Sequence, residues 1–222
     1  MNVVAQDGGL ASIILIADET KPEKGVNLPR LLSAVHERYS FVKAPNIQEA
    51  REHGAKFQNG VFRSGKREIA IGELGLFNDA FTVATTDTSD SELVLDDCFA
   101  WLKKDFAYRD QSRPYIRTYQ SDLICKFDND PGGAFANLKG FFEFLQKNMI
   151  PEASRAKKPV EFSGIAFGAD PSGAGASPEF TLFRRVSVPW HLGLWFSKAH
   201  LTTANHIKAL AMIDELLGGS KS

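Results

Sequence analysis

The residues whose types could do chemistry concentrate between positions 180 and 200, where the sequence reads FTLFRRVSVPWHLGLWFSKAH. This segment holds two of the three tryptophans, an arginine doublet and two of the five histidines. Tryptophan and arginine are enriched among the residues that dominate protein–protein binding. The sequence therefore predicts a partner-binding surface made of Arg184, Arg185, Trp190, His191 and Trp195.

The same segment also has a purely structural interpretation. If the doublet lies on a strand, Arg184 and Arg185 point to opposite faces, so one of them lies on the more buried side. That arginine would pack its stem on the sheet and pair its head with a carboxylate or a helix end, while the tryptophans fill the core. Pro189 would interrupt the strand ladder and expose Trp190 and His191 at an edge or bulge. The residues alone leave both roles open.

Motifs with enzymatic chemistry are absent from the sequence. No G-x-S-x-G stretch marks a nucleophile, and the glycine-rich residues 168–178 lack the spacing that cradles phosphate. His191, His200 and His206 are nine and six residues apart, which does not place two imidazoles on one helical turn as H-E-x-x-H does. We therefore expect no catalytic residue, no metal and no cofactor.

Composition limits the partners and the compartment. The 222 residues are 43% hydrophobic and carry a net charge of −1, which describes a globular chain without a global field for nucleic acid or an anionic membrane. Such a partner would need a local basic patch. The apolar residues 10–17 fall short of the roughly 20 needed to cross a bilayer. Cys98 and Cys125 are too few for a disulfide framework, so we expect a soluble cytoplasmic protein without membrane contact.

The hydrophobic period of the first half alternates between strand and helix. The expected elements are a strand over 11–17, a helix over 28–39, a short helix over 46–54, three strands within 56–86 and a helix over 89–106. Ser64-Gly65 and Asn78-Asp79 supply the turns between the three strands. Ser89 and Glu92 resemble a capping box at the start of the last helix.

The second half repeats this order. The expected elements are a strand over 115–127, a helix over 131–149, three strands over 160–167, 180–188 and 190–196, and a helix from 202 or 203 to 217. The sequence therefore predicts an α+β fold of mainly antiparallel sheets backed by amphipathic helices, in two pseudo-repeated strand, helix, three-strand, helix halves. We place the halves at 1–110 and 111–222, with one continuous domain as the alternative.

Three functions remain open. The favoured one is a non-enzymatic protein-binding or assembly module, acting on a protein partner or as a homo-oligomer. The second is a small hydrolase or isomerase with a histidine and a carboxylate drawn from separate elements. The third is nucleic-acid binding through a duplicated curved sheet in the manner of minor-groove binders, which the near-zero net charge disfavours. Its basic groups would be Arg63, Lys66, Arg67, Arg184 and Arg185.

Overall fold

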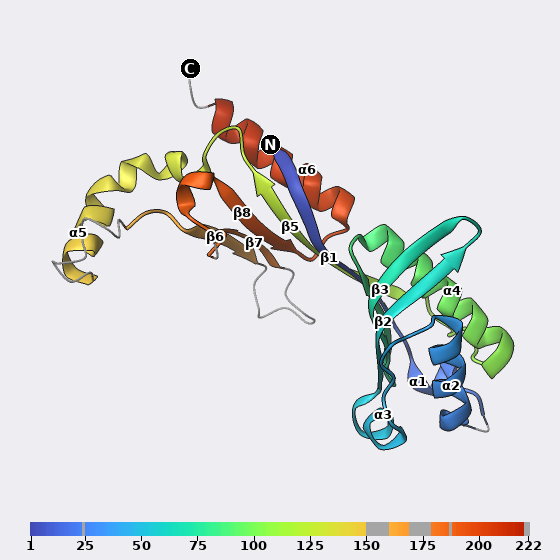
Figure 1. Cartoon of the computed structure of the whole chain (residues 1–222). Helices are drawn as coiled ribbons and strands as arrows, with labels where there is room; N and C mark the ends of the chain where they lie inside the picture. Colours follow the sequence, from blue (N-terminus) through green and yellow to red (C-terminus); the bar gives the residue numbers. More distant parts are fainter. Residues whose placement is uncertain (24, 150–159, 169–178, 187, 220–222) are drawn as a thin grey trace. The chain divides into compact units, whose positions relative to one another are not determined.

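The computed structural model is an α+β protein in which helices pack against antiparallel strands (Figure 1). The structure describes residues 1–23, 25–149, 160–168, 179–186 and 188–219. All five strand pairs whose register it gives, β1–β4, β2–β3, β3–β4, β6–β7 and β7–β8, are antiparallel. The predicted fold class is therefore confirmed.

The first half begins with a long strand and ends with a long helix. Its elements are β1 (Asn2–Ile14), α1 (Ala17–Thr20), α2 (Leu28–Arg38), α3 (Ile47–His53), β2 (Ala55–Ser64), β3 (Arg67–Leu76), β4 (Ala80–Thr85) and α4 (Thr88–Phe106). The two predicted turns lie where expected, with Gly65 in the left-handed region at φ 60°. Helix α3 begins with a capping box, since Asn46 accepts from the Glu49 backbone and the Glu49 side chain accepts from the Asn46 backbone.

The second half follows the same order. Its elements are β5 (Ile116–Lys126), the 3-10 helix η1 (Pro131–Leu138), α5 (Lys139–Met149), β6 (Gly164–Gly168), β7 (Glu179–Arg184), the 3-10 helix η3 (Trp190–Leu192), β8 (Leu194–Ala199) and α6 (Thr203–Gly219). Strand order also repeats: β2-β3-β4-β1 in the first half corresponds to β6-β7-β8-β5 in the second. The predicted repetition of strand, helix, three strands and helix is present.

Several element boundaries differ from the prediction. Helix α4 begins at Thr88, and Asp87 is its cap, because the Asp87 side chain accepts from the Ser89 backbone. The predicted Ser89–Glu92 capping box is therefore wrong. The expected helix over 131–149 is divided, with Phe135 at non-helical backbone angles inside η1. The expected strand over 11–17 is β1, which extends back to Asn2. Apart from Gly168, the glycine-rich loop 168–178 lies outside the described residues.

The chain divides into two compact units that do not coincide with simple cuts of the sequence. The N-terminal unit contains Gln6–Asp122 and His200–Ala204, and the C-terminal unit contains Met1–Ala5, Leu123–Ala199 and Asn205–Ser222. Strands β1 and β5 each contribute residues to both units. The boundary we expect near residue 110 stays a prediction.

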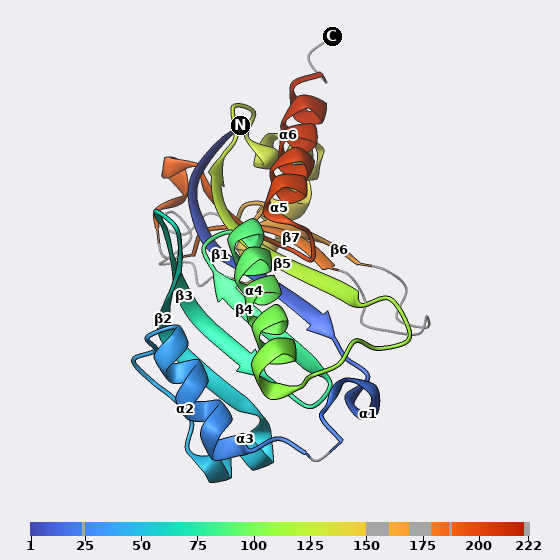
Figure 2. The same ribbon diagram turned by 90° about the vertical axis from the view of Figure 1, so that its right-hand side faces the viewer.

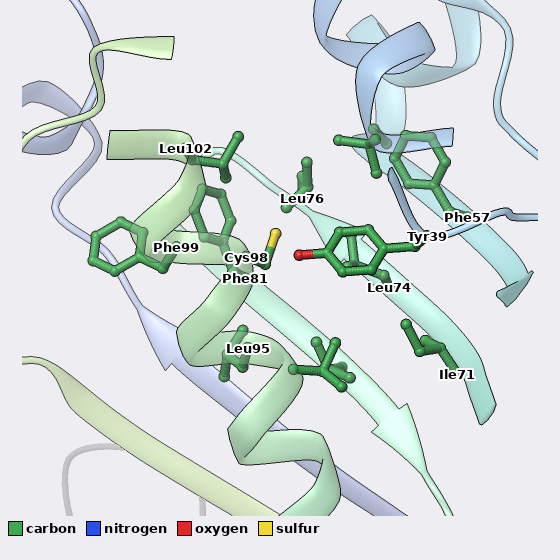
Figure 3. Packing of buried hydrophobic residues seen from close by; sticks show 14 of the residues in the cluster. Tyr39, Phe57, Ile71, Leu74, Leu76, Phe81, Leu95, Cys98, Phe99 and Leu102 are labelled. Atoms are coloured by element: carbon green, nitrogen blue, oxygen red, sulfur yellow. The ribbon is translucent and has the colours of Figure 1, made fainter. Parts of the chain in front are cut away.

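The N-terminal unit has the larger of the two hydrophobic clusters. Helices α2 and α4 lie on the same side of β2, β3 and β4 (Figure 2). Phe81 of β4 meets the edge of the Phe99 ring of α4, with 5.8 Å between the two ring centroids. The Tyr39 hydroxyl points toward Cys98 and donates to Asp97 Oδ2 at 2.8 Å (Figure 3). Cys98 is buried and is a core side chain, and this burial raises the pKa of its thiol to about 12.

The C-terminal unit packs α6 against its strands. Leu210 of α6 is fully buried in a cluster with Leu123, Leu182 and Trp195. At the centre of this packing, Ser197 Oγ and His206 Nε2 form a hydrogen bond of 2.8 Å, and both residues are fully buried. Within the described residues, no helix is both long and apolar enough to span a membrane.

Candidate functional site

Arg184 lies at the end of β7, directly opposite Trp195 of β8. Its guanidinium carbon is 4.8 Å from the Trp195 ring centroid and 5.4 Å from that of Trp190. Its Nη2 donates to Asp130 Oδ2 at 3.1 Å, and its Nε donates to the Phe162 carbonyl at 3.1 Å. The side chain is only 8% exposed, so cation–π contacts and hydrogen bonds replace the water it has lost.

Trp195 fills the core beside this arginine. It is 1% exposed, and its ring lies 6.3 Å from that of Phe127 and 6.1 Å from that of Phe162. Phe162 in turn stacks on Phe135 with a centroid distance of 4.0 Å. Arg184 and Trp195 therefore have the structural role that the sequence left open, and neither offers much surface to a partner.

Trp190 and His191 lie on a 3-10 turn, and the strand predicted over 190–196 begins only at Leu194. The turn follows Pro189 and ends at Gly193, whose φ of 65° is in the left-handed region that glycine adopts most easily. Trp190 is half-buried against the Arg184 guanidinium, and His191 is exposed. The turn, rather than a strand bulge, is what presents His191 to solvent.

Arg185 has a different environment from its neighbour. Its side chain is half-buried, and its backbone N–H donates to the Leu194 carbonyl at 3.0 Å. Of the doublet, Arg184 is thus the residue on the more buried side. The other arginines proposed for nucleic acid are paired: Arg63 with Glu68 at 2.7 Å, and Arg67 with Asp90.

Four of the five predicted site residues meet around one hollow of about 440 Å³. Its lining consists of Lys126, Phe127, Asp128, Asp130, Glu161, Arg184, Trp190, His191, Gly193 and Trp195. A second hollow of about 430 Å³ shares Asp130, Glu161 and Arg184 with the first and is walled by aromatic rings. Arg185 lines neither hollow.

The first hollow combines exposed carboxylates with an imidazole. Among the described residues, no hydrogen bond joins His191 to a carboxylate. The described histidines, cysteines and acidic residues form no group of three or more that could hold a metal. The Ser197–His206 pair is buried in the core, where no substrate reaches it.

Two aromatic residues that the sequence did not indicate as site candidates are exposed in the structure. Phe141 and Phe144 of α5 are 54% and 61% exposed. The apolar stripe of this helix runs through Phe142 and Leu145, which are half-buried. Two phenylalanines outside the stripe were the available signal, because a helix that packs on its own core places polar residues there.

Comparisons with known proteins give no family for this chain. No family model matches it, and no curated protein matches it. Among solved structures, one similar chain is Methanococcus jannaschii TBP, with 12% sequence identity, a TM-score of 0.42, and coverage of 97% of this chain and 98% of that chain. A similarity this low carries no argument about function.

Proposed function

We propose that this chain is a non-enzymatic protein-binding module whose C-terminal unit presents the binding surface. The observation that carries the proposal is the distribution of exposed phenylalanines among the described residues. Those with large exposed fractions are Phe141, Phe144, Phe167 and Phe183, and all four belong to the C-terminal unit. Phe141 and Phe144 are three residues apart on α5, so they are neighbours on its surface. Contiguous exposed apolar surface marks interaction sites in proteins.

Corresponding helices of the two halves differ in how far their apolar side chains are buried, which supports the proposal. Helix α2 buries Leu31, Leu32 and Val35 in the core of its unit. Helix α5 instead extends away from the strands of its unit (Figure 1). The side chains of Phe141 and Phe144 on this helix are exposed. The second half thus keeps an apolar helix face that the described residues of the chain do not cover, and a protein partner would bury it.

A photo-crosslinking experiment tests this function. Phe144 is replaced by the photoreactive benzoylphenylalanine in the whole protein, and adducts are sought after irradiation in the native cell. We expect a defined protein adduct at Phe144 that weakens when Phe141→Ser is added. The matched control carries the photoreactive residue at Met212, which is 62% exposed on α6 of the same unit. Adducts no more frequent at Phe144 than at Met212 would overturn the proposal.

A further inference from the structure

The two outermost strands, β2 and β6, differ in whether other described residues cover their outer hydrogen-bonding edges. The outer edge of β2 is closed by residues 39–43: the N–H of Val42 donates to the Asn59 carbonyl at 3.0 Å, and Lys43 and Gln58 exchange two bonds. For β6, the strand at the other end, β7 is the one pairing strand among the described residues. An uncovered edge is a template for another strand.

The register shows which backbone groups β6 offers. The Arg184 N–H donates to the Ser163 carbonyl at 2.7 Å, which makes Ser163 a hydrogen-bonded partner of β7. Because such pairs alternate along an antiparallel ladder, Ile165 and Phe167 also bond to β7. The N–H and C=O groups of Gly164, Ala166 and Gly168 therefore point to the open side.

The open edge lacks two of the features that protect natural edges. The five residues of β6, GIAFG, contain no charge and no proline. The covered β2 edge, by contrast, carries Lys56, Arg63 and a left-handed residue, Asn59, at φ 57°. Side chains on the three outward-bonding residues of β6 are no larger than a methyl group, so these side chains leave room for an approaching backbone.

We infer that β6 pairs with β6 of a second copy of this chain, antiparallel about a two-fold axis at Ala166. Gly164 then bonds to Gly168 of the second copy, and Ala166 to its own counterpart, each pair exchanging two N–H···O bonds. Between them, Ile165 faces Phe167 of the second copy, and the same contact recurs across the axis. Phe167, 57% exposed in the single chain, becomes a cross-strand partner.

Because β6 is complementary to its own copy, a second copy of this chain is the partner that fits this edge. The strand has no charge to repel its own image, and its two large side chains, Ile165 and Phe167, meet each other under the two-fold axis. This inference rests on the proposed function, since it names one partner of the C-terminal unit. It uses a different element, however, so β6 and α5 can be tested separately.

The test is the mass of the full chain in solution at micromolar concentration, by light scattering and native mass spectrometry. We expect wild type at twice 24.5 kDa. Ala166→Pro removes an outward N–H without touching the bonds to β7, and should weaken the dimer by about tenfold or more. Ala166→Ser, which keeps the N–H, is the matched control and should remain a dimer.

Charge pairing keeps the test decisive if the proline variant fails to fold. Ala166→Asp and Ala166→Lys each place like charges opposite one another across the axis and should be monomeric, whereas an equal mixture of the two should restore a dimer. A monomeric wild type, or a mixture that stays monomeric, overturns the inference. If the mass is unchanged in every Ala166 variant, self-pairing through β6 is wrong, while adducts at Phe144 would still support the proposed function.

Discussion

Arg184 shows how one side chain can connect distant parts of a sequence. Its carboxylate partner, Asp130, is 54 residues away, and two of its aromatic neighbours lie on the next turn and strand. Alternation along a strand predicted that one arginine of the doublet would be buried. It could not decide which, because the answer depends on where Asp130 and Phe162 come to lie in the fold.

The doublet gives the first stability prediction. Arg184→Ala removes packing between two tryptophans together with a buried hydrogen-bond donor, and should lower the free energy of unfolding by about 2 kcal/mol. Arg185→Ala, at a half-buried site, should change it by less than about 0.5 kcal/mol. Urea unfolding followed by tryptophan fluorescence measures both. Equal losses would show that Arg184 is not the structural member of the pair.

Asp214 gives a prediction about pH. Burial raises the pKa of its carboxyl group, but hydrogen bonds from the Met1 ammonium and from the Asn129 N–H outweigh burial, and the net shift is downward. A lowered pKa in the folded state stabilises the protein above the ordinary aspartate pKa, and this stability is lost as the pH falls through the folded-state value. Acidification below about pH 4 should therefore reduce the free energy of unfolding.

Asp214→Asn isolates this effect. The variant should be less stable than wild type at neutral pH, and its free energy of unfolding should fall less steeply on acidification. Glu215→Gln, an exposed neighbour on α6, is the control and should follow the wild-type curve. Thermal unfolding over a pH series provides the comparison, and parallel curves for Asp214→Asn and wild type would contradict the assignment.

At the scale of elements, β1 contacts the start of α4 closely enough to exclude a side chain. A Cβ on Gly9 would lie 2.4 Å from the Asp87 carbonyl carbon, whereas one on Gly8 would meet nothing nearer than 3.8 Å. Ser91 Oγ also donates to the Gly9 carbonyl at 2.7 Å, so the contact is bonded as well as tight. Separating the backbones of the strand and the helix start would therefore break this hydrogen bond and the packing around Gly9.

This contact predicts opposite results at adjacent positions. Gly9→Ala should destabilise the protein by about 1–3 kcal/mol, because backbone atoms must move to admit the methyl group. Gly8→Ala should be neutral or slightly stabilising, since alanine is stiffer than glycine in the unfolded chain. Differential scanning calorimetry of the two variants checks this. A neutral Gly9→Ala would mean that the strand and the helix start are further apart.

Elements with local signals were predicted well, and those without were not. Helix α2 has a cap at Asn27 and a clear apolar face, and the turn at Gly65 needs only glycine, so neighbouring residues decide both. The turn at Trp190–Leu192 was mistaken for a strand because aromatic residues favour strands in general. Here Pro189 and Gly193 impose a different backbone, and tertiary contacts with Arg184 hold it.

At the scale of the whole molecule, the two halves share an order of elements but not a pattern of burial. This asymmetry predicts that amides of α5 exchange with solvent at least about tenfold faster than those of α2, its counterpart in the repeat. Hydrogen exchange followed by mass spectrometry on the purified protein measures it. Equal protection of the two helices would show that α5 is covered, and would weaken the case for its role in binding.

Residue types in the sequence pointed to a set of candidate site residues, whose role in binding stays a prediction. The sequence identified Arg184, Trp190 and His191 by type, and the structure gathers them around one hollow. It could not reveal that Phe141 and Phe144 would be exposed, since exposure depends on whether α5 packs on its own unit. Such a choice between packing partners is a long-range property, which residue spacing does not encode.

Met1–Ala5 belong to the C-terminal unit, and this has a consequence for the order of folding. The Met1 ammonium contacts Asp214 at 2.5 Å across a sequence separation of 213 residues. The N-terminal unit instead comes almost entirely from the continuous segment Gln6–Asp122. Because contacts between residues far apart in sequence form slowly, we expect the N-terminal unit to fold before the C-terminal unit closes.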